Sequence, residues 1–163
     1  MDFVIDDLTS DDRDSVLAIY REGIDTGQAT FETSVPAWDD WDKKHLAKPR
    51  LAARIDGRLV GWIVLSPVSA RPVYSGVCEA SLYVAADYRN QGIGRALMEA
   101  MIDASEKHGI WTIQAVIFPE NQASRGLLKS LGFREIGIRE RIAKHNGIWR
   151  NTLLLERRSP MVE

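Results

Sequence analysis

The sequence predicts a mixed α/β fold, in which helices cover the faces of a sheet. Three observations predict it. Strand-like and helix-like patterns alternate along the chain, Asp56-Gly57 lies between two apolar runs, and residues 110–118 are almost wholly apolar. An Asp-Gly pair between apolar runs is a strong hairpin signal, so we expect residues 50–68 to form an antiparallel pair of strands. The apolar run at 110–118 is typical of a central strand covered on both faces.

The first part of the chain is predicted to hold a short strand and a helix. Residues 3–5 form the strand. Residues 9–22 are typical of a helix that Thr9 or Ser10 caps, and its core positions would be Val16, Leu17 and Tyr20.

A second helix is expected over residues 34–47. Ser34 is a suitable cap, and Pro36 suits the first turn of a helix. Its aromatic residues recur about one turn apart, which favours packing over a ligand cage: Trp38, Trp41 and His45.

Residues 78–85 alternate between apolar and polar or aromatic side chains. In a strand this pattern sends one set into the core and the other to the opposite face. The core set is Ala80, Leu82 and Val84, and the opposite set is Glu79, Ser81 and Tyr83.

A glycine-rich turn follows, in which Gly92 and Gly94 lie between Arg89 and Arg95. A helix follows it and ends near His108-Gly109. The first turn of a helix has unpaired N–H groups and a partial positive charge, and glycine lets an oxyanion approach the backbone. The turn therefore suits a phosphate or pyrophosphate, or else is a plain strand-to-helix turn. It lacks the third glycine of a Rossmann site and the GKS or GKT of a Walker A loop.

The chain then continues with the strand at 110–118, a helix over 120–133 and two strands at 134–142 and 148–156. Asn121 would cap the helix and Gly132 would close it.

Length and charge bound the function. At 163 residues, the chain is expected to form one domain, 1–163. With 21 Lys and Arg against 23 Asp and Glu, it has no global positive field to bind nucleic acid or an anionic membrane. The lone Cys78 is expected to be a buried apolar residue. Without a signal peptide pattern or an apolar stretch long enough to cross a bilayer, we expect a cytoplasmic protein.

Two motifs in sequence order resemble the GNAT superfamily of N-acetyltransferases. "YVAADYRNQGIGRAL" is followed by "NQASRGLLKSLGF", and the superfamily's pyrophosphate motif, Q/R-x-x-G-x-G/A, is matched by Arg89, Gly92 and Gly94. The resemblance implies a mixed, mostly antiparallel central sheet with helices on both faces.

Nearly the whole chain is similar to the phosphinothricin acetyltransferase branch of that superfamily, which includes enzymes that act on methionine sulfoximine. The similar segments are "ATFETSVPAWDDW", "RPVYSGVCEASLYV" and "AKHNGIWRNTLLLE".

The resemblance implies that acetyl-CoA is the co-substrate and that no metal is used. Asn121 would bind the pantetheine arm, although its position equally suits an ordinary helix cap. The strand backbone that would hold the arm is Leu82, Tyr83 and Val84. The turn whose N–H groups would wrap the pyrophosphate is Arg89, Asn90, Gln91, Gly92, Ile93, Gly94 and Arg95.

For catalysis, the resemblance makes Glu79 the first candidate for the general base; the alternative is a solvated glutamate on an edge strand. Glu32 is the alternative base, or would bind the substrate's ammonium group. A backbone N–H at 82–84 would stabilise the oxyanion, where family members splay two strands apart. Leu128 stands where the branch usually has a histidine and many other members a tyrosine. Since leucine cannot donate a proton, water or Tyr83 would have to suffice.

For the acceptor, the motif match points to Arg71 and Tyr74 as binding residues, with Phe31 as an apolar wall and Ser81 beside Glu79. We expect acetylation of the α-amino group of a small amino-acid analogue, such as phosphinothricin, methionine sulfoximine or an arsenical relative. The purpose would be detoxification, by the homodimer usual for the branch. The alternatives are acetylation of a protein N-terminus or lysine, or a non-catalytic acetyl-CoA-binding module. The histidines show no metal-like spacing and are expected at the surface or at helix ends: His45, His108 and His145. The resemblance places His145 and Trp149 where the branch closes its pocket, so a minor role in substrate binding or in a dimer contact is the alternative for them.

Overall fold

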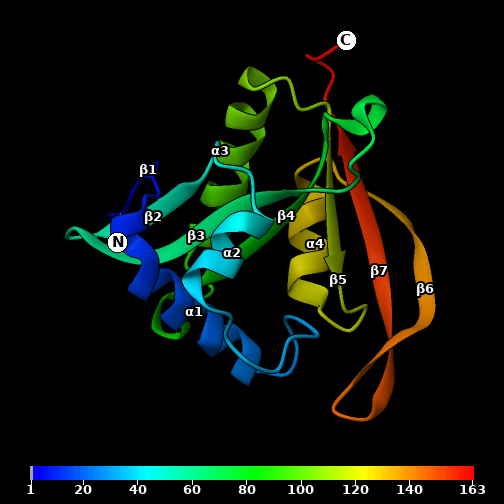
Figure 1. Cartoon of the computed structure of the whole chain (residues 1–163), viewed down its shortest axis with the longest axis horizontal. Coiled ribbons are helices and arrows are strands. Elements are labelled where there is room, and N and C mark those ends of the chain that lie inside the picture. Colours follow the sequence, from blue (N-terminus) through cyan, green and yellow to red (C-terminus); the bar gives the residue numbers. More distant parts are fainter. Residues whose placement is uncertain (1) are drawn as a thin grey trace.

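A single seven-stranded sheet with helices on both faces makes up the computed structural model, which describes residues 2–163 (Figure 1). Its strand order is β1-β2-β3-β4-β5-β7-β6, and every neighbouring pair is antiparallel except β4 and β5, which are parallel. The predicted mixed, mostly antiparallel sheet is therefore confirmed. The strands are β1 (Val4–Asp7), β2 (Leu51–Ile55), β3 (Arg58–Pro67), β4 (Val77–Val84), β5 (Thr112–Ile117), β6 (Arg134–His145) and β7 (Ile148–Arg158), and the helices are α1 (Arg13–Asp25), α2 (Trp38–Lys44), α3 (Ile93–Lys107) and α4 (Gln122–Ser130).

Two apolar clusters fill the two faces of the sheet. On one face, α3 and α4 cover strand residues such as Ile63 and Leu65, and Cys78 lies here at 1% exposure, as predicted. On the other face, α1 and α2 cover a cluster rich in aromatic rings, where the indole of Trp62 donates a hydrogen bond to the carbonyl of Val16 over 3.1 Å. The sheet is thus buried from both sides, and α2 is held by the fully packed ring of Trp41.

Local signals in the sequence set several element boundaries as predicted. Asp56 and Gly57 have φ of 50° and 77°, the left-handed conformation that a two-residue hairpin requires, and they join β2 to β3. Gly132 closes α4 with φ of 91°, and Asn121 caps it by accepting a hydrogen bond from the backbone N–H of Ser124 at 3.2 Å. Thr9 caps a short 3₁₀ turn, so that α1 begins only at Arg13.

The prediction for α2 is wrong at its start. The helix begins at Trp38, and Ser34 makes no cap. The residue before a proline is disfavoured in the helical region, and Ala37 after Pro36 is also extended, with φ of −65° and ψ of 151°. The helix therefore begins at Trp38, directly after the extended Ala37, and it ends at Lys44, before His45.

The most consequential feature of the sheet lies between β4 and β5. They pair only where 77–79 lies opposite 112–114. Along 80–84 and 115–117 of the described chain the two strands are no longer paired with each other, and Figure 1 shows them diverging. This explains why the expectation of a β5 covered on both faces is only partly met: Val116 and Ile117 stay half-buried beside the opening.

In the described residues, none of the helices has both the length and the apolar character needed to cross a membrane.

A glycine in α1 sets how closely that helix approaches β4. A Cβ built on Gly23 would lie 2.5 Å from Cε1 of Tyr83, well inside contact distance. We expect Gly23→Ala to lower the free energy of unfolding by about 1–3 kcal/mol, because the packed tyrosine ring or the helix must shift. Urea denaturation measures this.

The matched control is Gly126→Ala in α4, where nothing lies within 4 Å of the added Cβ. There the alanine should stabilise by up to about 1 kcal/mol, through helix propensity alone. Equal effects of the two substitutions would show that the contact with Tyr83 is unimportant.

Candidate active site

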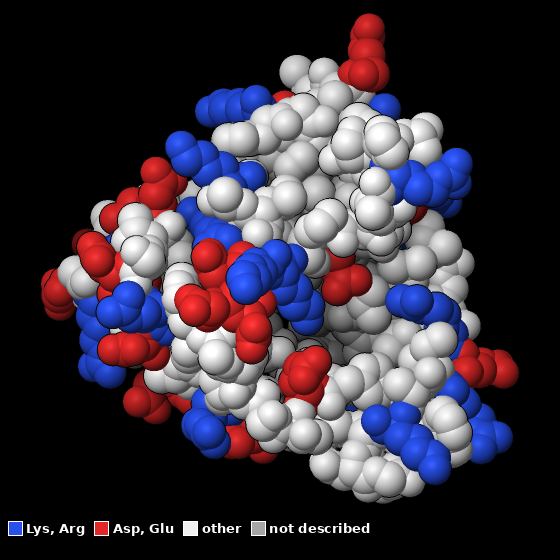
Figure 2. Space-filling model, viewed as in Figure 1, with Lys and Arg blue, Asp and Glu red and all other residues white. Residues whose placement is uncertain are grey.

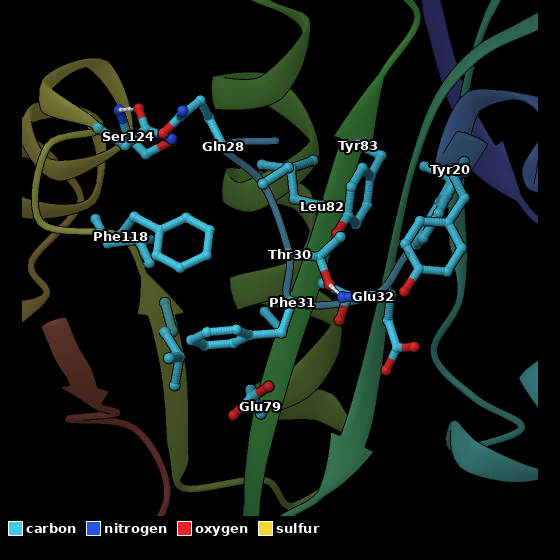
Figure 3. Close-up of a pocket in the computed structure, with 18 of the residues that line it drawn as sticks. Tyr20, Gln28, Thr30, Phe31, Glu32, Glu79, Leu82, Tyr83, Phe118 and Ser124 are labelled. Carbon is cyan, nitrogen blue, oxygen red and sulfur yellow. Dashed lines mark hydrogen bonds between the residues drawn. The ribbon is translucent and has the colours of Figure 1, made fainter. Parts of the chain in front are cut away.

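A cavity of about 490 Å³ opens where β4 and β5 separate (Figure 3). One wall is β4 from Glu79 to Tyr83, and the other is β5 with Phe118. Other parts of the wall come from residues 28–32, in the connection between α1 and α2, from α2 with His45 after it, and from side chains of α4. The predicted residues Phe31, Glu32, Glu79, Ser81, Leu82, Tyr83 and Asn121 all line this one cavity.

Glu79 is the last residue of β4 that pairs with β5, so it lies at the point of divergence. Its carboxyl group is half-buried, and burial raises its pKa above the ordinary value for glutamate. The positive charges of Arg139 and Lys44 act in the opposite direction on the same pKa. A carboxylate with a raised pKa binds a proton more readily near neutral pH, which suits a general base.

The phenol of Tyr83 faces the cavity from the same strand. Its ring lies 5.0 Å from that of Tyr20 and 4.9 Å from that of Trp62, in an edge-on and a tilted arrangement. Burial raises the pKa of Tyr83 well above the usual tyrosine value, so the hydroxyl keeps its proton near neutral pH and can donate a hydrogen bond. Leu128, the departure from the family pattern, is buried and also lines the cavity.

Phe31 and Glu32 are presented by the connection between α1 and α2. The backbone N–H of Glu32 donates to the hydroxyl of Thr30 over 3.1 Å, which fixes the local turn. The ring of Phe31 meets Phe118 edge-on at 5.1 Å across the cavity. Phe31 thus forms an apolar part of the cavity wall, and Glu32 lines the cavity while remaining exposed.

Arg150 on β7 ties this connection to the sheet, and sequence reasoning missed it. Its guanidinium donates to the carbonyl of Gly27 at 2.7 Å and to the side-chain oxygen of Gln28 at 2.9 Å. It also stacks over Phe118, at 3.5 Å from the ring centre. No sequence signal points to the contacts with Gly27 and Gln28, because these residues lie more than a hundred positions before Arg150.

The expectation that every histidine lies at the surface or at a helix end is wrong for His145. It is 7% exposed, and its ring lies 6.2 Å from both Phe31 and Phe118. His45 lies directly after α2 and also lines the cavity; burial lowers its pKa to about 4. His45 is therefore neutral near neutral pH. His108 does lie at a helix end, exposed, as predicted.

The structure does not bring Arg71 and Tyr74 to the cavity. They flank Pro72 in a short 3₁₀ turn between β3 and β4, where both are exposed. The guanidinium of Arg71 lies over the ring of Tyr74 at 5.5 Å. The 3₁₀ turn presents these side chains to the outside, whereas Glu79 is carried inward by the strand that follows.

The glycine turn precedes α3 and lies next to the open part of β4. Gly92 has φ of 86° and provides no side-chain cap, which leaves the first N–H groups of the helix without intrahelical partners. Gly94 lies next to β4, where an added Cβ would be 3.7 Å from Leu82, an ordinary contact, so packing alone does not require a glycine at this position. Arg89 donates to the carbonyl of Val84 at 3.2 Å, and Arg95 pairs with Glu99 at 2.9 Å. The backbone N–H groups, more than the two guanidinium groups, are thus available to an oxyanion.

Thr152 lines the cavity, and sequence reasoning missed it as well. Its hydroxyl is buried at the wall of the cavity and has no hydrogen-bond partner among the described residues. The sequence shows only a threonine within an apolar strand, and this pattern does not predict that its hydroxyl lies at a cavity wall. No group of three His, Cys, Asp or Glu within 2–163 is placed to hold a metal.

Comparison with known proteins agrees with this geometry. Residues 14–133 match the model of the acetyltransferase (GNAT) family. The chain belongs to the GNAT family. It is therefore an N-acetyltransferase.

Individual relatives show which members of the family this chain is similar to. This N-acetyltransferase is 34% identical to the phosphinothricin N-acetyltransferase of Alcaligenes faecalis, over 90% of this chain and 78% of that protein. It is 28% identical to an L-methionine sulfoximine/L-methionine sulfone acetyltransferase of Pseudomonas aeruginosa, over 85% of this chain and 84% of the other. The crystal structure of a phosphinothricin acetyltransferase from Sinorhizobium meliloti in complex with acetyl-CoA superposes with a TM-score of 0.87, at 26% identity, covering 97% of this chain and 89% of that one.

The raised pKa of Glu79 has a consequence for stability. In the folded protein the ionised carboxylate is penalised by burial, so the penalty appears as pH rises above the ordinary glutamate pKa of about 4.3. We expect Glu79→Gln to be more stable than the wild type near neutral pH, and the difference to vanish below that pKa. Urea denaturation across this pH range measures it.

Glu140→Gln on the exposed face of β6 is the control, and it should show no such pH-dependent difference. A stability gain for Glu79→Gln that stays constant or grows toward acid pH would contradict the assignment of a raised pKa.

Proposed function

We propose that this GNAT enzyme transfers the acetyl group of acetyl-CoA to the α-amino group of a small amino-acid analogue, such as phosphinothricin or methionine sulfoximine, and so detoxifies it. The observation that carries the proposal is the carboxyl group of Glu79, half-buried in a cavity of about 490 Å³ at the point where β4 and β5 separate. A cavity of this size suits a small molecule. The relatives named above support the choice of acceptor.

Three parts of the chain fit acetyl-CoA, which would supply an activated acetyl thioester. The backbone of β4 at 80–84 is unpaired on the side toward β5 and would bind the amide groups of the pantetheine arm. The amide of Asn121 faces the same cavity and would bind the arm while it also caps α4. The turn at 89–95 would surround the pyrophosphate with backbone N–H groups at the start of α3.

Glu79 would act on the acceptor's amine. An α-ammonium group must lose a proton before it can attack, and the carboxylate of Glu79 would accept that proton, directly or through a water molecule. Its raised pKa brings it closer to that of the amine. A thiol has a pKa near 8.5, so CoA leaves as a tolerable thiolate. The phenol of Tyr83 would donate a hydrogen bond to that thiolate, and water would supply the proton, because burial raises the pKa of Tyr83 well above that of a thiol.

The test is release of CoA thiol from acetyl-CoA in the presence of L-phosphinothricin or L-methionine sulfoximine. We expect turnover with at least one of them, and a loss of about 10²- to 10⁴-fold in kcat/KM for Glu79→Gln, the range that general base catalysis contributes. Glu140→Gln should retain full activity.

The same assay distinguishes the proposed function from the competing functions. Thiol release with N-terminal peptides or lysine peptides, and with neither amino-acid analogue, would replace the proposal by protein acetylation. Tight binding of acetyl-CoA without release for any amine would indicate a binding module. A Glu79→Gln variant as active as the wild type would remove Glu79 from the mechanism.

Leu128 gives a separate prediction about the proton donor. If thiolate departure needs no dedicated acid, Leu128→His should change kcat by less than about tenfold, whereas a missing general acid is worth about 10²-fold or more. Leu128→Asn controls for the cost of placing a polar side chain at this buried position, and thermal denaturation verifies folding of both variants. A gain of several orders of magnitude for the histidine alone would show that proton donation limits the enzyme.

A further inference from the structure

The charges around the cavity are unequal in number. Carboxylates of Glu32, Asp40 and Glu79 line it, and among residues 2–163 Lys44 is the one lysine or arginine that does so. His45 also lines the cavity but is neutral near neutral pH, as described above. Figure 2 shows acidic and basic side chains together around the central hollow. Such a site suits an acceptor that has one anionic and one cationic group.

Lys44 is held in place by its helix, while its charge is left available. It lies in the last turn of α2, whose Trp41 is 2% exposed and packs edge-on against Trp62 at 5.4 Å. Its side chain makes no ion pair or hydrogen bond with the described residues, even though Asp40 lies one turn earlier on the same helix face. Arg50 nearby, by contrast, is paired with Asp42 at 2.6 Å.

Lys44 and Glu79 face the same space. Both line the cavity, Lys44 from α2 and Glu79 from β4. The positive charges of Arg139 and, to a smaller extent, Lys44 lower the pKa of the Glu79 carboxyl. Arg139, however, is not part of the cavity wall.

We propose that Lys44 binds the α-carboxylate of the acceptor and makes this N-acetyltransferase select amino acids over other amines. The inference rests on the proposed function. In an α-amino acid the amine and the carboxylate are attached to one carbon, so an amine beside Glu79 places the carboxylate only a few ångströms away. A lysine that shares the cavity with Glu79, and that has no partner among the described residues, supplies the complementary charge. Arg71, the candidate from the sequence, lies outside the cavity.

The experiment compares Lys44→Met with Lys43→Met, which removes an equal charge from the adjacent position. Both lysines are exposed to solvent, but of the two only Lys44 lines the cavity. The acceptors are L-methionine sulfoximine and its α-carboxamide, which lacks only the anionic charge. For Lys44→Met we expect KM for the free acid to rise about tenfold or more, the worth of a hydrogen bond to a charged group. KM for the carboxamide, KM for acetyl-CoA and kcat should stay within about twofold, and Lys44→Arg should restore part of the loss.

Equal losses for the acid and the carboxamide would overturn the inference in favour of a structural role, as would equal losses in Lys43→Met. A loss with L-phosphinothricin but not with methionine sulfoximine would place Lys44 at the phosphinate and likewise overturn it. Calorimetric binding of the acid and the carboxamide to the CoA-bound enzyme separates this inference from the proposed function. Tighter binding of the acid that depends on Lys44, without turnover, would uphold Lys44 as the carboxylate site and refute acetylation of these acceptors.

Discussion

The site depends on where the pairing of β4 with β5 stops. The two strands share three register positions, and beyond Glu79 and Gln114 they separate. Had pairing continued, the backbone groups of 80–84 would be consumed by the sheet, and the cavity would be filled. Because it stops, one sheet provides both a rigid frame and an open edge of donors and acceptors. Glu79 occupies the last paired position, which fixes its backbone while its side chain reaches the open part.

Around that opening, the two faces of the sheet position different parts of the site. The face under α3 and α4 brings the glycine turn beside Leu82 and Val84. The face under α1 and α2 is dominated by interlocking aromatic rings, which hold the end of α2 with Lys44, while Phe31 packs against Phe118 and His145. The cofactor and the acceptor would therefore approach the same carboxylate from opposite sides of the sheet, each over a surface of its own.

Sequence alone predicts the features that depend on local chemistry. The hairpin at Asp56-Gly57, the alternation along β4 and the cap at Asn121 are set by neighbours in the chain, and each is found in the structure. The grouping of Glu32, Glu79 and Asn121 around one cavity could be anticipated through family resemblance. The available charge of Lys44 and the contacts of Arg150 could not, because they depend on partners distant in sequence. Arg71 matches the family motif but lies outside the cavity, because the motif does not determine the direction in which the turn presents its side chains.

Arg150 also has a consequence for the order in which the site is completed during synthesis. β7 follows all other strands in the chain, yet it inserts between β5 and β6, and its Arg150 fastens the connection at Gly27 and Gln28. Proteins emerge from the ribosome amino end first. A nascent chain that already contains the glycine turn, Glu79 and α4 would still lack the strand that secures Phe31 over the cavity. The acceptor half of the site is thus assembled last, and a chain shortened before β7 would lose it first.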